Sequence, residues 1–350
     1  MAEINKKSDL KNPVLSIIIP HHGGVNILNE CLSSLEKSTY KNYEIIVVDN
    51  ASKDNSIKEA KNKFPYINIL TQNQNLGYAG GCNKGAIHSR GEFLLFLNND
   101  TKHEPNWIEP LLDLISKDKT IGSIQPKILN ANQKKIFDYA GGSGGFIDLL
   151  CYPFTRGRIF NTIEPDEGQY NDKKEIFWAS GCAFITRKDL FLKIFFDEKF
   201  FTYMEEIDYS WKVILLKYKN FVEPKSVIYH TGGTLKNRGF FKSYFNHRNS
   251  MIIFLTNHNP LIMLLLLIPK ILLEILSLIR YLLILNIKGF LAQICSYFWI
   301  LLHPIYLINR VVNINNIKNA PLYSVINKML KGSVVIKYFL LKNKKYLDIR

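Results

Sequence analysis

Phe93-Leu94-Leu95-Phe96-Leu97-Asn98-Asn99-Asp100 is the stretch of sequence that decides the fold. Its five consecutive apolar residues predict a strand buried on both faces, as in a parallel sheet covered by helices. The run stops at two asparagines and an aspartate, so the strand delivers an acid to the edge of the sheet. Ligands of open α/β sheets bind beyond the carboxyl ends of the strands, and a carboxylate there suits a divalent cation. A strand followed by an ordinary polar turn is the alternative.

Similar apolar runs alternate with helical patterns on either side of this strand. The predicted strands span residues 14–19, 44–48, 67–70, 93–97, 183–186 and 226–229. The predicted helices span residues 26–37, a glycine-punctuated stretch that ends at 86, and 205–217. This alternation with short connections predicts an α/β fold with a mostly parallel sheet. Between about 130 and 175 the pattern loosens, and we expect loops or short antiparallel strands there.

The composition fits one large domain or two smaller ones in a reducing compartment. At 350 residues the chain can bury a large core. Its five cysteines are odd in number and scattered, without a CxxC pair, which argues against a disulfide framework and a zinc site. Residues 1–12 are polar and charged and lack the apolar core of a secretory signal, so we expect an N-terminal tail there.

The positive charge of the chain is concentrated in its last hundred residues. Residues 251–350 hold nine Lys and three Arg against two acids, a net +10 of the formal +15. A basic surplus can indicate nucleic acid, but here it flanks strongly apolar segments. This combination predicts an anionic membrane surface as the partner, and no nucleic acid, because juxtamembrane Lys and Arg each contribute about 1 kcal/mol to membrane binding.

Three apolar segments in this region are candidates to meet the membrane. They span residues 260–269, 271–287 and 289–309. The last carries His303 as its one side chain that charges near neutral pH, and it is long enough to cross a bilayer. The first two are interrupted by Pro269 and by charges, which favours interfacial or re-entrant helices. Buried helices of a soluble domain are the alternative.

Two further stretches place polar or flexible residues next to predicted strands. Asp49 follows an apolar strand, where it can accept hydrogen bonds from a base or a ribose, with a plain turn as the alternative. Residues 75–85 are rich in glycines, which either let the backbone approach a ligand at a helix N-terminus or pack a helix onto a sheet. They match neither GxGxxG nor GxxxxGK[ST], which argues against a dinucleotide dehydrogenase and a P-loop NTPase.

Acids and a histidine follow later in the chain. Glu205, Glu206 and Asp208 fall in the first turn of a predicted helix, where they either complement the helix dipole or do chemistry. Their mutual repulsion raises the pKa of at least one of them, and a carboxyl group of raised pKa beside a hydroxyl suits general-base catalysis. His230 ends a strand, where it is either structural or, if it meets Asp100, a ligand of the same metal.

Six blocks in chain order resemble glycosyltransferase family 2, in its rhamnosyltransferase-like branch. The blocks are Ser16–Pro20, Val48–Ser52, Asn75–Asn83, Leu97–Asp100, Ala179–Ala183 and Tyr203–Asp208. The resemblance extends from Leu15 to about Asn249 and implies a GT-A fold, a Rossmann-like, mostly parallel sheet flanked by helices. We therefore expect a catalytic domain at residues 13–250 and a basic, apolar, helical membrane-associated region at 251–350.

The resemblance also implies roles for individual residues. Asp100 corresponds to the surviving acid of a motif that binds Mg²⁺ or Mn²⁺, and His230 to a histidine that completes the metal site. Glu206 corresponds to the catalytic base, with Glu205 and Asp208 as alternatives. The residues implied to bind the nucleotide sugar are Pro20, Asp49, Asn50, Asn75, Gly77, Asn83 and Asn99. The residues implied to line the acceptor pocket are Trp178, Ser180, Gly181 and Cys182.

The chain departs from the family pattern after its first strand, where His21-His22-Gly23 stands in place of the usual Thr-Tyr-Asn. A late pair, Arg248-Asn249, also resembles the family, but the sequence gives it no role. The implied function is inverting, metal-dependent transfer of a sugar, rhamnose being one candidate, from a dTDP- or UDP-linked donor. The acceptor is a hydroxyl of a lipid-linked or cell-surface glycan at the cytoplasmic face of the cell membrane.

Three other functions compete with this one. A processive polysaccharide synthase is disfavoured because the chain has no Gln-x-x-Arg-Trp motif. A sugar nucleotidyltransferase is expected to carry a basic residue in a glycine-rich loop after the first strand, and His21-His22-Gly23-Gly24 lacks one. A non-catalytic membrane scaffold of a polysaccharide assembly complex stays open, although Asp49, Asp100 and Glu206 are all retained.

Overall fold

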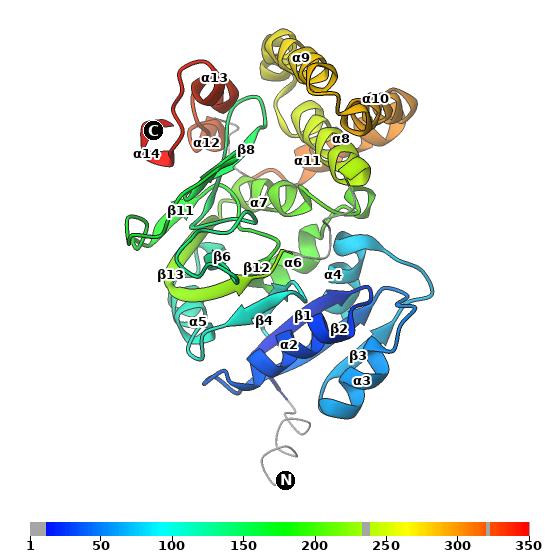
Figure 1. Cartoon of the computed structure of the whole chain (residues 1–350), viewed down its shortest axis with the longest axis vertical. Helices are drawn as coiled ribbons and strands as arrows, with labels where there is room; N and C mark the ends of the chain where they lie inside the picture. The colour runs from blue at the N-terminus through cyan, green and yellow to red at the C-terminus, as the bar shows by residue number, and fades with distance from the viewer. Residues whose placement is uncertain (1–11, 233–238, 320–322, 350) are drawn as a thin grey trace.

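The structure is a computed structural model that describes residues 12–232, 239–319 and 323–349. All but the last residue of the expected N-terminal tail lies outside these ranges. Figure 1 shows the sheet and its covering helices in the lower and middle parts of the molecule, with the helices of the C-terminal third gathered at the top.

Among the described residues, nine strands form one central sheet. Its path is β11-β13-β6-β12-β4-β1-β2-β3, and β5 pairs with β13. The strands are β1 (Leu15–His21), β2 (Tyr43–Asp49), β3 (Asn68–Thr71), β4 (Phe93–Leu97), β5 (Thr101–His103), β6 (Ile121–Asn130), β11 (Lys174–Ile176), β12 (Ala183–Arg187) and β13 (Lys219–His230). Strands β4, β1, β2 and β3 are parallel, and β12 runs antiparallel between β4 and β6. The predicted α/β class is confirmed, with the second half of the sheet mixed.

Helices cover both faces of this sheet, which is why β2 and β4 are buried at every position. One face meets α2 (Val25–Glu36), α3 (Ser56–Lys63) and α5 (Ile108–Lys117). The other meets α4 (Gly77–His88), α6 (Lys188–Ile194) and α7 (Glu205–Leu215). Side chains alternate between the two faces along each strand, so that Ile17 packs toward α2 while Ile18 packs toward α4. The carboxyl ends of β1, β2 and β4 share one edge.

The loosely patterned segment between 130 and 175 contains a small antiparallel sheet, as expected. Its strands are β7 (Gly145–Ile147), β8 (Pro153–Thr155), β9 (Arg158–Ile159) and β10 (Thr162–Ile163). A short 3-10 helix, η1 (Glu198–Phe200), precedes α7. The turn between η1 and α7 leads directly into the acids that the sequence singles out, which lie in the first turn of α7.

The C-terminal third folds into helices whose boundaries differ from the predicted ones. They are α8 (Gly239–Asn257), α9 (Pro260–Leu283), α10 (Ile287–Leu302), α11 (Pro304–Ile317), α12 (Tyr323–Ile326), α13 (Val334–Phe339) and α14 (Tyr346–Ile349). The break expected at Pro269 is wrong, because α9 continues through it. The apolar segment expected at 289–309 is divided between two helices, because the chain bends by 75° between α10 and α11, where Pro304 has no backbone N–H to bond to the preceding turn.

In the described part of the chain, α9 is the one helix that is long and apolar enough to cross a membrane, and the bent pair α10–α11 qualifies if it is counted as one span. The expected domain boundary at 250 falls inside α8. A single apolar cluster joins Trp178, Ile207 and Trp211 to Ile252 and Ile300 across that boundary. The C-terminal helices therefore share a core with the sheet-bearing region.

Candidate active site

The edge formed by β1, β2 and β4 brings together several of the polar residues that the sequence singles out. His21, the last residue of β1, pairs in register with Asp49 at the end of β2. Its Nδ1 lies 2.7 Å from Nδ2 of Asn99, and its Nε2 lies 2.8 Å from Oγ of Ser56. Burial lowers the pKa of His21 to about 4, so the imidazole is neutral at pH 7. Sequence reasoning missed this contact, although His21 stands where the family pattern is broken.

Asp49 and Asn50 organise the loops that follow the strands. Asp49 Oδ1 accepts a hydrogen bond from the backbone N–H of Ser52 at 2.9 Å. Asn50 donates from Nδ2 to the carbonyl of Gly77 at 3.0 Å, while its Oδ1 is buried without a hydrogen-bond partner among the described residues. Asn75 Oδ1 accepts from the N–H of Gly77 at 2.8 Å. The predicted residues Asp49, Asn50 and Asn75 thus meet at one edge.

The glycines of α4 mainly serve packing. Gly77 has a positive φ of 71°, and a Cβ there would lie 2.3 Å from the carbonyl oxygen of Phe201. A Cβ at Gly81 would lie 2.9 Å from Asn50 and 3.2 Å from Pro20. The amide of Asn83 exchanges hydrogen bonds with the backbone of Phe196 at 2.9 and 3.1 Å. Helix α4 is therefore packed closely against its neighbours through Gly77, Pro20 and Asn83. This arrangement agrees with the alternative that the glycines pack a helix onto the sheet.

Asp100 and His230 meet as the sequence predicts, together with an acid that it does not. Nε2 of His230 lies 3.2 Å from Oδ1 of Asp100, and its Nδ1 lies 2.8 Å from Oδ1 of Asp138. Burial lowers the pKa of His230, but the hydrogen bonds and charges of the two aspartates outweigh burial and raise the pKa to about 10. Sequence reasoning missed Asp138 because it lies in the loosely patterned segment.

A divalent cation fits these residues. Asp100 offers a hard oxygen ligand. His230 directs Nε2 toward Asp100, while Nδ1 is bonded to Asp138. Proteins commonly orient a metal-binding histidine through such a bond at its other ring nitrogen. Within residues 12–232, 239–319 and 323–349, no group of three His, Cys, Asp or Glu is arranged to hold a metal ion. Water and ligand phosphates are the usual remaining partners of Mg²⁺.

Glu205 and Glu206 begin α7 after a strained turn. Tyr203 and Met204 both have positive φ, 67° and 71°, which non-glycine residues rarely adopt. Burial raises the pKa of Glu206 to about 7, although nearby backbone N–H groups favour its charged form. Burial, and then the charge of Glu206, raises the pKa of Glu205 well above its usual range. One oxygen of each carboxyl group is buried without a hydrogen-bond partner among the described residues.

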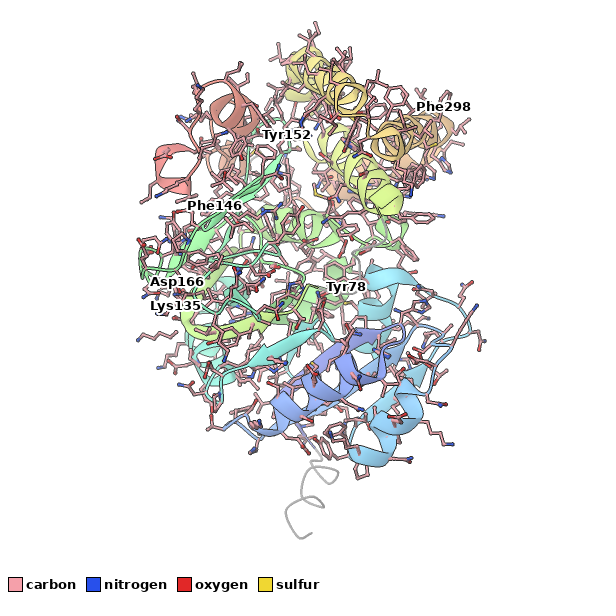
Figure 2. The ribbon with its side chains drawn as sticks, viewed as in Figure 1. Tyr78, Lys135, Phe146, Tyr152, Asp166 and Phe298 are labelled. Carbon is pink, nitrogen blue, oxygen red and sulfur yellow. The ribbon has the colours of Figure 1, made fainter. Side chains whose placement is uncertain are left out.

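The loop that follows Trp178 faces these acids. The carboxyl carbon of Glu206 lies 3.7 Å from where a Cβ at Gly181 would be, and the hydroxyl of Tyr78 donates to the carbonyl of Gly181. Figure 2 shows Tyr78 at the junction between the N-terminal half of the sheet and the rest of the molecule. Glu206, Gly181 and Tyr78 thus gather from three separate elements.

The other residues predicted to line the acceptor pocket are buried. Trp178 donates from Nε1 to the carbonyl of Phe146 at 2.8 Å. Ser180 is held by Gln125, whose Oε1 accepts from its N–H at 2.9 Å. Cys182 accepts from the N–H of Asn98 at 2.9 Å through its carbonyl oxygen. Gly181 is the one half-buried residue of the four, and it has no side chain. The loop therefore faces the two glutamates with its backbone.

Asp208 is not brought together with the two glutamates. Its side chain is fully buried and lies 2.6 Å from Nη2 of Arg310 and 2.7 Å from Nζ of Lys212. Burial raises its pKa, but Arg310 and Lys212 outweigh burial and hold the pKa well below its usual range. Asp208 also accepts a hydrogen bond from Asn257 at 2.8 Å. We therefore expect Asp208 to hold α7 in place, which narrows the candidates for a base to Glu205 and Glu206.

The Arg248–Asn249 pair acquires a role that the sequence does not give. Nδ2 of Asn249 lies 3.0, 3.1 and 2.7 Å from the carbonyl oxygens of Phe200, Thr202 and Tyr203. Arg248 donates to the carbonyl of Phe200 at 3.1 Å. Both residues lie in α8, so this helix anchors the strained turn that presents Glu205 and Glu206.

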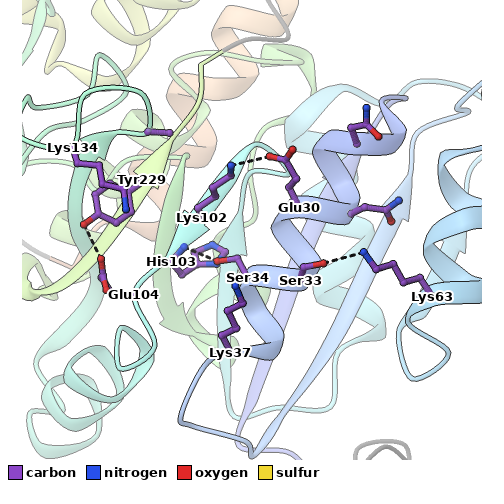
Figure 3. A pocket seen from close by; sticks show the side chains of 13 residues that line it. Glu30, Ser33, Ser34, Lys37, Lys63, Lys102, His103, Glu104, Lys134 and Tyr229 are labelled. Atoms are coloured by element: carbon purple, nitrogen blue, oxygen red, sulfur yellow. Dashed lines mark hydrogen bonds and ion pairs between the residues drawn. The ribbon is translucent and has the colours of Figure 1, made fainter.

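A hollow of about 580 Å³ lies apart from these acids, between α2, α3, β5 and β13 (Figure 3). Its charged side chains are largely paired with neighbours. Lys102 meets Glu30 at 2.9 Å, and the hydroxyl of Tyr229 donates to Glu104 at 2.7 Å. It is lined by none of the residues predicted for the nucleotide sugar, the acceptor, the metal or the base.

Comparison with known proteins gives a consistent family assignment. A family model described as glycosyl transferase family 2 matches residues 16–195, just over half of the chain. The chain is 26% identical over 213 residues to an uncharacterized glycosyltransferase of Rickettsia prowazekii, a match that covers 59% of the chain and 60% of that relative. It is 23% identical over 249 residues to an N-acetylglucosaminyl-diphospho-decaprenol L-rhamnosyltransferase of Mycobacterium tuberculosis, which covers 66% of the chain and 80% of the relative.

The fold is shared with a solved structure. A crystal structure of GalNAc-T7 with UDP, GalNAc and Mn²⁺ matches 69% of this chain and 51% of its own, with a TM-score of 0.52 and 21% sequence identity. At this identity the likeness concerns the fold. It agrees with the expected GT-A architecture, the predominantly parallel sheet with flanking helices described above.

Proposed function

This chain belongs to glycosyl transferase family 2, and we propose that it is an inverting, metal-dependent glycosyltransferase. It transfers a sugar from a nucleoside-diphosphate sugar to a hydroxyl group of a lipid-linked or cell-surface glycan. The observation that carries the proposal is the placement of Glu206 beside Gly181 and Tyr78, with a carboxyl group whose pKa burial raises to about 7. A carboxyl group with a pKa near neutral pH is matched to proton removal from a hydroxyl.

Glu206 acts as the general base of a single displacement. Its carboxylate takes the proton of the acceptor hydroxyl while that oxygen forms a bond to the anomeric carbon. The bond between the anomeric carbon and the diphosphate oxygen breaks on the opposite face, and the electron pair leaves with the nucleoside diphosphate. Configuration at the anomeric carbon is therefore inverted. The Asn249-anchored turn keeps Glu206 in place for this step.

Asp100 and His230 are the residues that would hold Mg²⁺ or Mn²⁺. His230, oriented by Asp138 at Nδ1, would give up its Nε2 proton when the ion binds. When bound, such an ion neutralises charge on a departing diphosphate. The nucleotide is held at the same edge. Asp49 and Asn50 face it from the end of β2, and His22 stands in the place of the tyrosine that the family pattern carries there.

The Mycobacterium relative supports a rhamnosyl donor and a polyprenyl-linked acceptor as the first candidates, because its name specifies an L-rhamnosyltransferase and a diphospho-decaprenol. UDP-linked hexoses and galactofuranose are further donors to be tested. A lipid-linked acceptor requires the enzyme to work at a membrane. The apolar helix α9 and the basic C-terminal third support a location at the cytoplasmic face of the cell membrane.

A non-catalytic scaffold is the second candidate, and a nucleotide-release assay separates the two. Purified protein, dTDP-, UDP- and GDP-sugars and a membrane lipid extract are incubated with and without Mn²⁺. We expect metal-dependent release of free nucleoside diphosphate from one donor class. If the folded protein releases no nucleoside diphosphate from any donor and binds none of the donors, the scaffold function would be favoured instead.

Asp100→Ala is expected to lower this metal-dependent turnover by at least about 100-fold, because several kcal/mol of charge stabilisation by the metal are lost. Titration of Mn²⁺ by calorimetry in the presence of the nucleoside diphosphate measures the binding half of this effect. Asp113→Ala is the matched control, since Asp113 is an exposed acid of α5 that pairs with Lys117. An equal loss in both variants would contradict the metal-binding role of Asp100.

Activity is expected to rise with pH through about 7. Glu206 works as a base in its deprotonated form, so below the raised pKa each unit of acidification should lower kcat/KM about tenfold. The contribution of Glu206 to folding stability changes in the opposite direction, so the free energy of unfolding decreases as the pH rises. A carboxyl group whose pKa is higher in the folded protein stabilises the fold below its unfolded value, and this contribution is lost as the pH rises through 7. A kcat/KM profile that is flat between pH 5.5 and about 8 would contradict the assignment.

A further inference from the structure

Helix α9 buries charged side chains and exposes apolar ones, the reverse of a surface helix in a soluble protein. Its two buried residues are Lys270 and Glu274, which are charged. Its exposed surface is apolar up to Arg280 near its end, for example at Leu264, Leu265 and Leu272, which are 58%, 78% and 56% exposed. Monomeric soluble proteins rarely expose so continuous an apolar surface.

The buried side of α9 is bonded to three other parts of the protein. Lys270 lies 3.0 Å from Glu274, and its Nζ lies 3.8 Å from the ring centre of Tyr152 in the turn before β8. Glu274 accepts hydrogen bonds from Tyr152 at 2.7 Å and from Gln293 of α10 at 2.9 Å. His247 of α8 lies 3.2 Å from Glu274. Hydrogen bonds and ion pairs of Lys270 and Glu274 thus hold the middle of α9 against the rest of the protein.

The next two helices also expose apolar side chains. Phe298 and Leu301 of α10 are 61% and 74% exposed, and Ile305 and Ile308 of α11 are 74% and 62% exposed. Figure 2 shows Phe298 on the outer side of the C-terminal helices, while Tyr152 lies on their inner side toward the sheets. We call the exposed apolar residues of α9, α10 and α11 the apolar face.

We propose that α9, α10 and α11 lie flat on an anionic lipid bilayer, with the apolar face inserted into it, and that α9 does not span the membrane. The proposal deepens the proposed function and rests on it in part, because it names the surface that brings the active site to a lipid-linked acceptor. To span the bilayer, α9 would have to leave Tyr152, Gln293 and His247 and carry Lys270 and Glu274 into hydrocarbon, which is costly for charged side chains. Lying flat keeps every one of these contacts.

The charges around the apolar face match an anionic surface. Arg280 near the end of α9 and Lys288 at the start of α10 are exposed on either side of a turn that carries Leu285, which is 82% exposed. The guanidinium of Arg280 lies 6.0 Å from the ring centre of Phe339 on α13, so the basic C-terminal segment adjoins the same region. An interfacial helix with Lys and Arg beside its apolar side binds anionic lipid most strongly.

Flotation with lipid vesicles tests the binding, without donor or acceptor, so that the result is independent of catalysis. We expect the full chain to float with phosphatidylglycerol-containing vesicles and much less with phosphatidylcholine alone. Leu265→Glu combined with Leu272→Glu should lower the partition coefficient at least about tenfold. Ile87→Glu is the matched control, because Ile87 is a similarly exposed apolar residue of α4. Thermal unfolding verifies that all variants are folded.

Cysteine labelling distinguishes a flat helix from a spanning one. In a Cys295→Ser background, which removes the exposed cysteine, single Asn259→Cys and Lys288→Cys variants place a thiol at a polar position beyond each end of α9, outside the apolar face. Protein bound to the outside of sealed vesicles is treated with a membrane-impermeant maleimide before and after the vesicles are opened. We expect both ends to react before opening. Protection of one end until the vesicles are opened would show a span and overturn the proposal.

Two further outcomes would overturn the proposal as well. The protein could fail to float with either vesicle type while self-associating through Leu265 and Leu272, which would assign the apolar face to a second copy of the chain. The double variant could also float as well as the wild-type protein. A vesicle-bound enzyme that releases no nucleotide would instead contradict the proposed function and leave the membrane-binding mode intact.

Discussion

Replacing Glu206 by Gln is expected to lower kcat by about 10²–10⁴-fold while leaving donor binding nearly unchanged. The amide keeps the shape and much of the hydrogen bonding of the carboxyl group, but it cannot accept the proton of the acceptor hydroxyl. Single-turnover measurements with saturating donor report the chemical step, and calorimetry reports donor affinity. The pH dependence gives a second signature, because the rise through about 7 should disappear in this variant.

Glu205→Gln is the sharpest control for that experiment. Glu205 shares the first turn of α7 with Glu206 and is 4% exposed, so the two variants change the same charge in the same turn. If Glu205→Gln loses the chemical step and Glu206→Gln retains it, the base is Glu205. If an exposed acid such as Asp113 gives an equal loss, neither glutamate acts as the base.

Arg310→Met is expected to destabilise the protein by about 3–5 kcal/mol, because it removes the buried cation that Asp208 and Asp197 share. Arg310 is 5% exposed and contacts both Asp208 and Asp197, which come from different elements. Lys212 still faces Asp208 in the variant, at 2.7 Å, but Asp197 has lost its ion pair. Urea denaturation followed by circular dichroism measures the free energy of unfolding.

Two variants give this measurement its controls. Arg310→Met combined with Asp208→Asn removes both partners of the buried ion pair and should recover part of the loss. Lys328→Met removes a partly exposed ion pair with Glu175 and should cost at most about 1 kcal/mol. An effect of Arg310→Met no larger than that of Lys328→Met would contradict the importance of the buried pair.

Local patterns in the sequence were sufficient to predict the first half of the fold. The strand predicted at 93–97 coincides with β4, and the helix predicted at 26–37 coincides with α2 to within one residue. An apolar run and a 3.6-residue period depend on neighbours in the chain, so they can be read without knowing the fold. The antiparallel insertion of β12 between β4 and β6 depends on distant pairing and was not predicted.

The candidate site was predicted in outline, and its assignments depended on distant contacts. Asp100 and His230 meet as predicted, but Asp138 stands 92 positions from His230 in the chain and carried no local signal. Asp208 and Glu206 are two positions apart on one helix, and the contact that separates their roles comes from Arg310. Helix α9 passes through Pro269 because its middle is fastened at Lys270 and Glu274, which outweighs the local preference for a break.

The ion pair between Asp208 and Arg310 also bears on the order in which the protein matures. The two residues are 102 positions apart, and the ribosome adds about 5–20 residues per second from the N-terminus onward. Helix α7, which carries Glu205 and Glu206, therefore emerges well before the helix that supplies the cation for Asp208. We expect the nascent chain to form the parallel part of the sheet first and to acquire transfer activity last. By then the surface that we propose to meet lipid has been synthesised, so we expect a partly made chain not to consume nucleotide sugar away from the membrane.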